Sequence, residues 1–513
     1  MTNVPASESS SPRANALVLG LLTLGVMLAA WYLYFTHTGF SVQCHADEPG
    51  KVLQIQTSER NYHHPLLLLN TVQAVVAATG MEATPQKIVR AGRMTAAAFS
   101  ALGILAFSCA AWLAGGRLAA ILCALFLLGS PLLLEMAHFF KEDPALIMGL
   151  GVVFLGIALC QRNPGVPSLL VLALGAALAC SAKHLGVVVL PFCLVTVVGC
   201  RRGEGGQSAK RPLLLFLAVT LGLYCLINYQ AVANLGHFAG GIDREVGFIK
   251  DGGQIQTAHT SPLLPLRKYV GLVRGNLPFP LLWFLGFAIY SCIKERSART
   301  PLGQALLLAG VLFLLLAGVP KTAARYVLPV VCLLCFAAAL GAARLFAKPG
   351  WAWKTAGFAL PLVLALGLDI SQCAPIFDSF ATDNRRQMAQ WITQNLPANA
   401  VIAQDALGLM ASASDTRSDS PYKVPQSLYD AGADIQACTL DALRASGVQY
   451  LAVVIDERAE SRKRKTGKVA ATPFAAELAT KCKKVWECSG GKTRVSNVKP
   501  DIALYRIAGM ETQ

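Results

Sequence analysis

Residues 16–35 read ALVLGLLTLGVMLAAWYLYF, an apolar stretch of twenty residues without a single charge. A helix of about 20 residues covers the hydrocarbon core of a bilayer, which is about 30 Å thick. The stretch ends in bulky aromatic residues instead of the small residues of a signal-peptide cleavage site, which indicates a retained transmembrane span. Similar apolar blocks follow it, so the sequence predicts a polytopic α-helical membrane protein.

The overall composition agrees with this fold class. Of the 513 residues, 54% are hydrophobic and 14% are charged, whereas about a quarter of the residues in a soluble domain are charged. The formal net charge is +16, but much of it lies in short loops between apolar blocks, which indicates membrane orientation and not a nucleic-acid partner. With the first span, eleven spans are predicted, the others being 93–114, 118–134, 144–160, 167–182, 184–200, 213–231, 277–293, 302–319, 326–343 and 355–371.

The densest short Lys/Arg loops are 201–211, 294–299 and 344–354. Because such loops stay in the cytoplasm, the N-terminus is expected inside, and an odd number of spans places the C-terminus outside. The expected organisation is a cytoplasmic tail 1–15, a transmembrane domain 16–372 with outer loops 36–92, 135–143, 232–276 and 320–325, and an outer domain 373–513.

The C-terminal part changes to a soluble pattern. Residues 382–405 predict an amphipathic helix, a turn and the short strand AVIA, and residues 440–456 repeat helix, turn and strand. With a third strand, DIALYRI at 501–507, these segments predict a small α/β domain. Cys482 and Cys488 are the one plausible disulfide, provided that the domain lies in an oxidising compartment.

Two acid–proline motifs flank apolar blocks on the expected outer face. The first, HADEPGKV at 45–52, contains Asp47 and Glu48 with His45 beside them. The second, HFFKEDPAL at 138–146, contains a charged triplet at the start of the fourth span. Such acids are either ordinary loop residues, favoured at a helix N-terminus by its dipole, or parts of a site. The residues of the second motif that concern us are His138, Lys141, Glu142 and Asp143.

Imidazoles and cations lie on the same face. The segment ERNYHHP contains His63 and His64, before a semi-apolar helix that is too short to span and is expected along the membrane interface. Cations at the mouth of a span either snorkel to the interface or hold a phosphate. The candidates are Lys321 and Arg325 with Tyr326 at the tenth span, and Arg267, Lys268 and Arg274 before the eighth.

Together these groups favour one kind of chemistry. A carboxylate removes the proton of an acceptor hydroxyl, and a cation neutralises charge on a departing phosphate. The sequence has no Gly-rich phosphate loop, and the acids face away from the cytoplasm. A lipid-linked phosphate donor is therefore expected instead of a nucleotide.

In layout, residues 15–372 resemble the GT-C superfamily of integral membrane glycosyltransferases, within it the bacterial protein-mannosyltransferase and aminoarabinose-transferase-like branch. The motifs that resemble this branch are the outer-loop ADE, HFFKEDPALI and KTAARYVLPVV. The resemblance implies a polyprenyl-phosphate sugar donor and inverting transfer on the outer face of the bacterial inner membrane, to an acceptor that is lipid A, a protein or another glycan.

The resemblance also implies roles for residues. It makes Asp47 the general base with Glu48 beside it, and the two acid motifs the two lips of one cavity. ADEPGKV lacks the aromatic residue that many relatives carry after the acids, which leaves acceptor contacts open; a divalent metal is also open, with no ligand assigned. The expected cavity residues are His45, His63, His64, His138, Lys141, Glu142 and Asp143, and those for the donor phosphate are Lys321, Arg325, Tyr326, Arg267 and Lys268.

Two rival functions remain. A transporter or flippase of a lipid-linked or envelope substrate would carry ionisable residues within its spans, near the midplane. Here the spans are almost free of charge, Lys183 being an exception, and the acids gather at one face. This distribution favours the enzyme over the transporter, and over a scaffold that uses its C-terminal domain only for binding.

Overall fold

The structure is a computed structural model that describes residues 12–40, 45, 47–202, 210–250, 263–294, 300–319, 323–347, 350, 353–382, 384–397, 400–404, 439–445, 447–454, 477–478, 480–489 and 501–507. The chain divides into two compact units. The membrane unit comprises Met1–Thr36, Thr57–Gly80 and Ala91–Ala374. The second unit comprises His37–Gln56, Met81–Arg90 and Pro375–Gln513. Each unit is described by itself.

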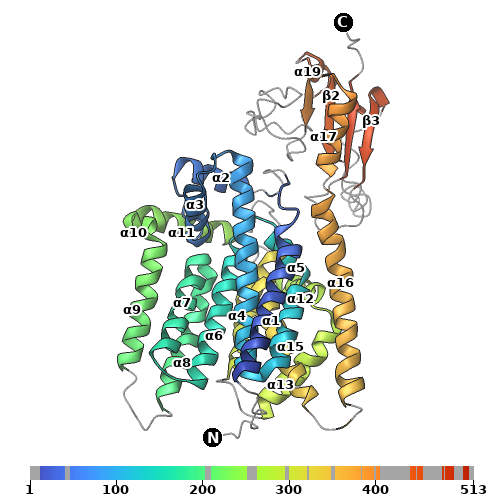
Figure 1. Ribbon diagram of the computed structural model, residues 1–513. Helices are drawn as coiled ribbons and strands as arrows, with labels where there is room; N and C mark the ends of the chain where they lie inside the picture. Colours follow the sequence, from blue (N-terminus) through green and yellow to red (C-terminus); the bar gives the residue numbers. More distant parts are fainter. Residues whose placement is uncertain are drawn as a thin grey trace. The chain divides into compact units, whose positions relative to one another are not determined.

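Apolar helices build the membrane unit (Figure 1). By length and composition, six helices of the described residues suffice to cross a membrane, and the bent pair α12–α13 makes up to seven. Four shorter apolar helices accompany them. The chain is thus a multi-pass membrane protein, and each of the eleven predicted spans overlaps an apolar helix, although the number of crossings stays a prediction. The helices are α1 (Pro12–Ala30), η1 (Trp31–Phe35), α3 (Leu67–Thr79), α4 (Pro85–Leu128), α5 (Pro131–Ala137), α6 (Asp143–Arg162), α7 (Val166–Ala182), η3 (His184–Val189), α8 (Leu190–Arg202), α9 (Lys210–Ile227), α10 (Tyr229–Ala233), α11 (Leu235–Lys250), α12 (Leu263–Asn276), α13 (Phe279–Lys294), α14 (Pro301–Ala317), η4 (Ala324–Val327), α15 (Leu328–Phe346), η5 (Trp353–Ala359) and α16 (Leu360–Ala381).

The long element α4 is two helices joined at a kink. Gly116 has φ 81° and ψ −172°, a conformation outside the helical region that glycine tolerates. An unbroken helix of 44 residues would be about 66 Å long, twice the thickness of the bilayer core. The break lies between the two spans that the sequence predicts at 93–114 and 118–134.

Small residues bring α6 and α7 into close contact. A Cβ added at Gly149 or Gly175 would overlap the backbone of the facing helix, and the same holds at Gly156. Helices in membranes associate through such small residues because these let the backbones approach. Since the loop between α6 and α7 is short, the two helices are antiparallel, and the start of α6 lies at the same end as the end of α7.

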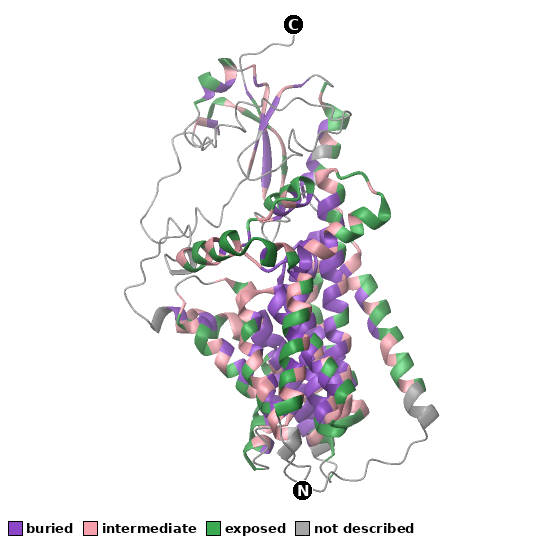
Figure 2. Cartoon of the chain, turned by 90° about the vertical axis from the view of Figure 1, so that its left-hand side faces the viewer, coloured by how far each residue is buried: buried purple, intermediate pink, exposed green. Residues whose placement is uncertain are grey.

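Aromatic rings fill the centre of the membrane unit. Phe107 of α4, Phe154 of α6 and Phe336 of α15 are fully buried, with ring centroids 5.4 to 5.9 Å apart. Figure 2 shows the buried residues on the sides of the helices that face one another. This core holds α4 together with α6 and α15, the two helices at whose starts candidate site residues lie.

The second unit contains a four-stranded sheet with the strand order β1-β2-β4-β3. β1 (Ile402–Gln404) pairs in parallel with β2 (Tyr450–Val454), and β4 (Ile502–Arg506) is antiparallel to both β2 and β3 (Lys483–Cys488). Met388 and Ile392 of α17 (Asn384–Asn395) pack on one core cluster of this sheet. The small α/β domain is therefore confirmed, together with its three predicted strands; β3 was not predicted.

The structure does not bridge the two cysteines that the sequence offers as a possible disulfide. Cys482 directly precedes β3 and Cys488 is its last residue. An extended strand rises about 3.3 Å per residue, so these cysteines lie about 20 Å apart, whereas bridged cysteines have Cα atoms within about 7 Å of each other. The thiol of Cys488 instead lies 3.5 Å from Oε1 of Gln387 in α17.

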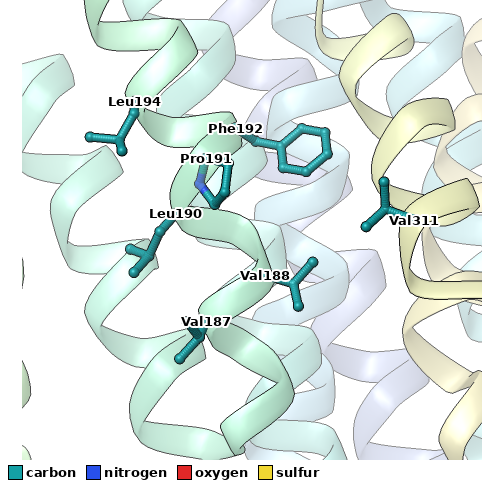
Figure 3. Close-up of a pocket in the computed structure, with 7 residues that line it drawn as sticks. All are labelled: Val187, Val188, Leu190, Pro191, Phe192, Leu194 and Val311. Carbon is teal, nitrogen blue, oxygen red and sulfur yellow. The ribbon is translucent and has the colours of Figure 1, made fainter. Parts of the chain in front are cut away.

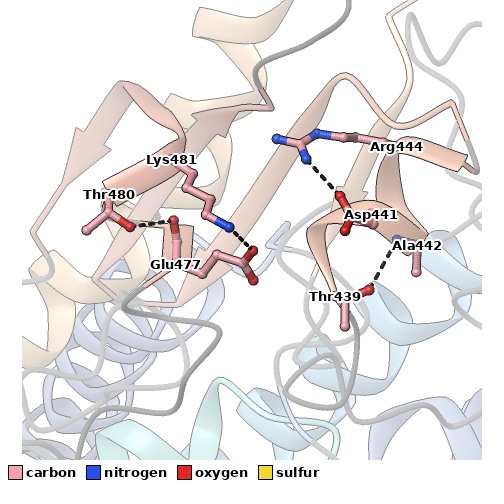
Figure 4. A network of polar contacts seen from close by, with 7 residues as sticks. All are labelled: Thr439, Asp441, Ala442, Arg444, Glu477, Thr480 and Lys481. Carbon is pink, nitrogen blue, oxygen red and sulfur yellow. Dashed lines mark hydrogen bonds and ion pairs between the residues drawn. The ribbon is translucent and has the colours of Figure 1, made fainter.

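Local polar contacts fix the short helical segments beside the sheet (Figure 4). The hydroxyl of Thr439 accepts from the N–H of Ala442 at the start of α19 (Leu440–Ala445), which is typical of a helix N-cap. Arg444 pairs with Asp441 at 2.9 Å, and Lys481 with Glu477 at 2.9 Å. The remaining helix of this unit is α2 (Glu48–Thr57).

Candidate active site

The centre of the candidate site is an ion pair between the ends of two neighbouring helices. Asp143 is the first residue of α6, and Lys183 directly follows α7. Because the helices are antiparallel, these residues meet, and Nζ of Lys183 lies 2.7 Å from Oδ1 of Asp143. The side chains are 2% and 14% exposed for Asp143 and Lys183, so the pair is largely withdrawn from solvent.

The local sequence explains both positions. Pro144 occupies an opening position of α6, where a missing N–H costs nothing, and Asp143 is favoured there by the helix dipole. Lys183 is extended, with φ −156° and ψ 145°, and so ends α7. The chain then turns into η3 across Gly186, where any Cβ would overlap the carbonyl of Ala179. The side chain of Lys183 is thus presented by a tightly packed helix end.

Further cations surround this pair. Nζ of Lys183 lies 5.1 Å from the ring centroid of Tyr326, and Cζ of Arg325 lies 5.5 Å from the same ring. Arg325 and Tyr326 belong to η4, at the start of α15. Lys141, 1% exposed, is within electrostatic range of Arg325, Lys183 and the two acids Glu142 and Asp143. Three positive and two negative groups therefore share this cluster.

Burial acts strongly on Lys141. It lowers the pKa of this ammonium from 10.5 to about 8, against the opposing influence of the Glu142 carboxylate. Arg325 and Lys183 lower it further by repulsion, since every added positive charge disfavours another. At pH 7 Lys141 is still charged, so the cluster carries one excess positive charge and is suited to an anion.

One oxygen of Asp143 remains available. Oδ1 takes the Lys183 ammonium, whereas Oδ2 is buried and accepts no hydrogen bond from the described part of the chain. A buried acceptor without a donor is costly, and a ligand hydroxyl or N–H removes that cost. The arrangement thus combines an anion-attracting group of cations with an acceptor for a neutral polar group.

The segment Tyr62–Pro65 lies beside this cluster within the membrane unit. His184 follows Lys183 directly, and its ring is within electrostatic range of His64. Nδ1 of His63 lies 4.0 Å from Oε2 of Glu245 in α11. Tyr62 has a positive φ of 54° and is buried, which is uncommon for a bulky residue. The structure thus brings His63 and His64 to the side of the cluster on which His184 lies.

Asn228 connects this segment to the end of α7. Its Oδ1 accepts from the N–H of Leu66 at 2.8 Å, and its Nδ2 donates to Oγ of Ser181 at 2.8 Å. Ser181 lies two residues before Lys183. The fully buried Asn228 therefore fixes the helix end that presents Lys183.

His138 is the remaining histidine of the second acid motif. It is fully buried at the end of α5, and its Nδ1 lies 2.9 Å from the carbonyl oxygen of Leu134. Glu142 is the N-cap residue of α6, without a side-chain capping bond. His138 therefore belongs to the end of α5, and Glu142 directly precedes α6.

Asp47 and Glu48 belong to the second unit, where Glu48 is the first residue of α2 and Asp47 directly precedes it. The N–H of Asp47 donates to Nδ1 of His45 at 3.2 Å, and the N–H of Glu48 donates to the carbonyl of His45 at 3.0 Å. Both acid–proline motifs therefore begin helices, as the helix-dipole reading expects, and His45 orders the turn before the first. The role of Asp47 as general base stays a prediction.

The other phosphate candidates divide into two groups. Lys321 lies outside the described residues. Arg267 and Arg274 are exposed on α12, and Lys268 is half-buried there.

Sequence reasoning treated Lys183 only as an exception to the charge-free spans and missed Asn228 and Ser181. A lone cation between two apolar runs was the signal for Lys183.

Within the described ranges, no three His, Cys, Asp or Glu side chains form a group that could hold a metal ion. A requirement for a divalent metal therefore stays open, as the sequence left it. The addition of a chelator to the working protein tests it directly.

Several solved structures are similar to this chain. The crystal structure of ArnT from Cupriavidus metallidurans bound to undecaprenyl phosphate matches with a TM-score of 0.54 and 14% identity, covering 98% of this chain and 100% of that chain. The apo state of that protein matches with a TM-score of 0.52 and 14% identity, over 96% and 98% of the two chains. The oligosaccharyltransferase AglB from Archaeoglobus fulgidus, in complex with an inhibitory peptide and a dolichol-phosphate, matches with 0.50 and 13%, over 91% and 73%.

No family model matches the sequence, and no curated protein matches it either. The likeness to solved structures, which extends over nearly the whole chain, shows the fold. The chain shares the overall fold of the ArnT and AglB structures, as the resemblance in its sequence predicted, and it carries a small C-terminal α/β domain.

Proposed function

We propose that this protein is a glycosyltransferase that moves a sugar from a polyprenyl-phosphate donor to an envelope acceptor, with inversion at the anomeric carbon. The observation that carries the proposal is the cluster of Lys141, Lys183 and Arg325 around Asp143, in a chain with the GT-C fold. ArnT, which shares this fold, has been crystallised with undecaprenyl phosphate. A net positive, largely buried cluster at the helix ends suits the phosphate of such a lipid.

In this reaction the acceptor oxygen or nitrogen attacks the anomeric carbon on the side opposite to the phosphate. The bond between that carbon and the phosphate oxygen breaks, and its electron pair leaves with the polyprenyl phosphate. A carboxylate takes the acceptor proton, a role assigned to Asp47 by resemblance. Lys183 and Arg325 neutralise the charge that grows on the leaving phosphate, which is where electrostatic stabilisation contributes most.

An apolar cavity near the cluster suits the lipid part of the donor. It has a volume of about 670 Å³ and lies between η3–α8 and α14 (Figure 3). Every residue that lines it is apolar, and the first, Val187, is four residues after Lys183. An isoprenoid chain whose phosphate reaches Lys183 can therefore bury part of its length here, and burial contributes about 25 cal/mol per Å².

The proposed location is the bacterial inner membrane, with the catalytic loops and the C-terminal domain on the outer face. The Lys/Arg-rich loops favour this orientation. Candidate acceptors are lipid A, a protein or another glycan. Ordinary membrane lipids surround the spans.

The decisive experiment compares envelope glycolipids and glycans by mass spectrometry in a deletion strain and in strains complemented with wild type or with Lys183→Met. We expect one glycan modification to disappear in the deletion strain, to return with the wild type and to stay absent with Lys183→Met. A matched variant, Lys210→Met at the opposite end of a different helix, should restore it as well. Identical envelopes in all strains would contradict the proposal.

The alternative is a transporter or flippase of a lipid-linked substrate. Purified protein in liposomes with a polyprenyl-phosphate sugar separates the two functions, because a flippase moves this lipid and leaves its sugar–phosphate bond intact. Release of free polyprenyl phosphate, in proportion to sugar on the acceptor, identifies the transferase.

A further inference from the structure

Apolar surface continues past the end of the spanning helix α9. Exposed leucines on α9, such as Leu221 and Leu226, face the lipid. The next helices, α10 and α11, run crosswise at the end of α9 (Figure 1). They expose Tyr229 (58%), Leu235 (64%) and Val246 (41%).

The residues of α11 divide around its axis. Leu235 and Val246 are eleven residues apart, about three helical turns, so they share one side. Exposed Arg244 lies nine residues after Leu235, two and a half helical turns, and therefore on the opposite side. With its charged residues α11 is not among the candidate spans, but a helix with one apolar and one charged side is typical of segments that lie in the plane of the membrane.

A further side of α11, different from the apolar and the charged sides, packs against the rest of the membrane unit. Phe238 packs against Tyr62 and His184, each with ring centroids 6.2 Å away. A Cβ at Gly241 would lie 2.6 Å from the carbonyl oxygen of Tyr62. Glu245 lies 4.0 Å from His63. These contacts fix which side of α11 is left exposed.

We propose that α10 and α11 form an in-plane membrane anchor whose Tyr229, Leu235 and Val246 enter the boundary between lipid headgroups and acyl chains. The occupant of this face is the bilayer because the face continues from the lipid-exposed side of a spanning helix, and because tyrosine is enriched at the membrane interface. The docked edge contacts His184, next to Lys183, so the anchor sets the depth of the Lys183 cluster relative to the lipid surface. This inference needs only the membrane fold and is independent of the proposed transfer reaction.

Photo-crosslinking in native membranes tests the anchor. Benzoylphenylalanine replaces Leu235, Val246 or, as the matched control on the opposite, charged side of the same helix, Arg244. After irradiation, we expect phospholipid adducts on the purified full chain at positions 235 and 246, and no such adducts at position 244. All three positions are exposed, so each replacement has room, and the amount of protein in the membrane provides the folding check.

Three results would overturn the proposal. Adducts with a protein at 235 and 246, including a second copy of this chain, would mean that the face is a protein interface. Equal lipid adducts at all three positions would mean that α11 has no oriented insertion. Absence of any adduct at 235 and 246, with normal protein amounts, would place the face in water.

Discussion

The ammonium of Lys183 lies 2.7 Å from a carboxylate oxygen of Asp143, although 40 residues separate them in sequence. The pair closes the α6–α7 hairpin and leaves the second oxygen of Asp143 available. The same two side chains therefore stabilise the hairpin and belong to the proposed ligand site, and variants can separate these two roles.

The first prediction concerns the ion pair. Lys183→Met leaves the buried Asp143 carboxylate without its hydrogen-bonded partner, which should cost about 3–5 kcal/mol of unfolding free energy. The double variant Lys183→Met with Asp143→Asn should recover most of this loss. Thermal unfolding in detergent measures both. The exposed pair Lys87–Glu82, with side chains 53% and 72% exposed, is the control, and Lys87→Met should cost less than about 1 kcal/mol. Equal effects at the two pairs would show that the Lys183 pair is solvated.

The second prediction concerns Asp47. Asp47→Asn retains the shape of the side chain but cannot accept a proton, so turnover should fall at least about a hundredfold. Membrane insertion and unfolding should not change. The control is Asp441→Asn, an exposed aspartate of the same unit, which should leave turnover unaffected. Near-normal transfer by Asp47→Asn would remove this residue from the mechanism.

Arg325→Lys is the third variant. A guanidinium can donate two parallel hydrogen bonds to a phosphate, and an ammonium cannot reproduce them. Losing one such contact to the leaving phosphate should cost about 2–4 kcal/mol of transition-state stabilisation, seen as lower kcat/KM for the lipid donor. Arg162→Lys, at the opposite end of α6, serves as the control and should be silent.

If Arg325 only snorkels, lysine replaces it without loss. The stricter comparison is the double variant Lys321→Ala with Arg325→Ala. Wild-type activity in this variant and in Arg325→Lys would mean that these cations only anchor the helix. The phosphate site would then be sought at Arg267, Lys268 and Arg274.

The fourth prediction is a pH dependence. Burial lowers the pKa of Lys141 to about 8, so its charge disappears as the pH rises through that value. Binding of polyprenyl phosphate should therefore weaken above about pH 8, and Lys141→Arg, which stays charged, should remove this decline. The free energy of unfolding should change in the opposite direction. In the unfolded chain Lys141 keeps its proton up to about pH 10.5, whereas in the folded chain it loses it near pH 8, so stability rises with pH between about 8 and 10.5. Unchanged binding of the lipid from pH 7 to 9 in the wild type would contradict a role for this charge.

Membrane orientation is the fifth prediction. Reporter fusions at Gly205 and Ser297 should report the cytoplasm, and fusions at Gly252 and Gly447 the outer compartment, because basic loops stay inside. A cytoplasmic signal from Gly447 would place the C-terminal domain on the wrong side for outer-face transfer.

Much of the fold could be predicted from local patterns, because each span is an uninterrupted apolar run. The contact between Asp143 and Lys183 could not be predicted, because the sequence does not say which helices are neighbours. In the structure α6 and α7 are neighbours because small residues such as Gly149 and Gly175 let the two backbones approach closely. The strand β3 was missed because half of its sequence, KKVWEC, is charged and exposed. It lies at the edge of the sheet, where charged residues prevent pairing with other chains.

Glycine at position 186 has a consequence for anyone who wishes to redesign donor preference. A methyl group there would overlap the carbonyl of Ala179 and push η3 away from α7, although it would touch no ligand. A library that randomises the surroundings of Lys183 should therefore keep residue 186 constant. Otherwise, variants whose backbone is displaced will be mistaken for variants with altered sugar selectivity. Variants that recognise a different sugar will then be hard to distinguish from them.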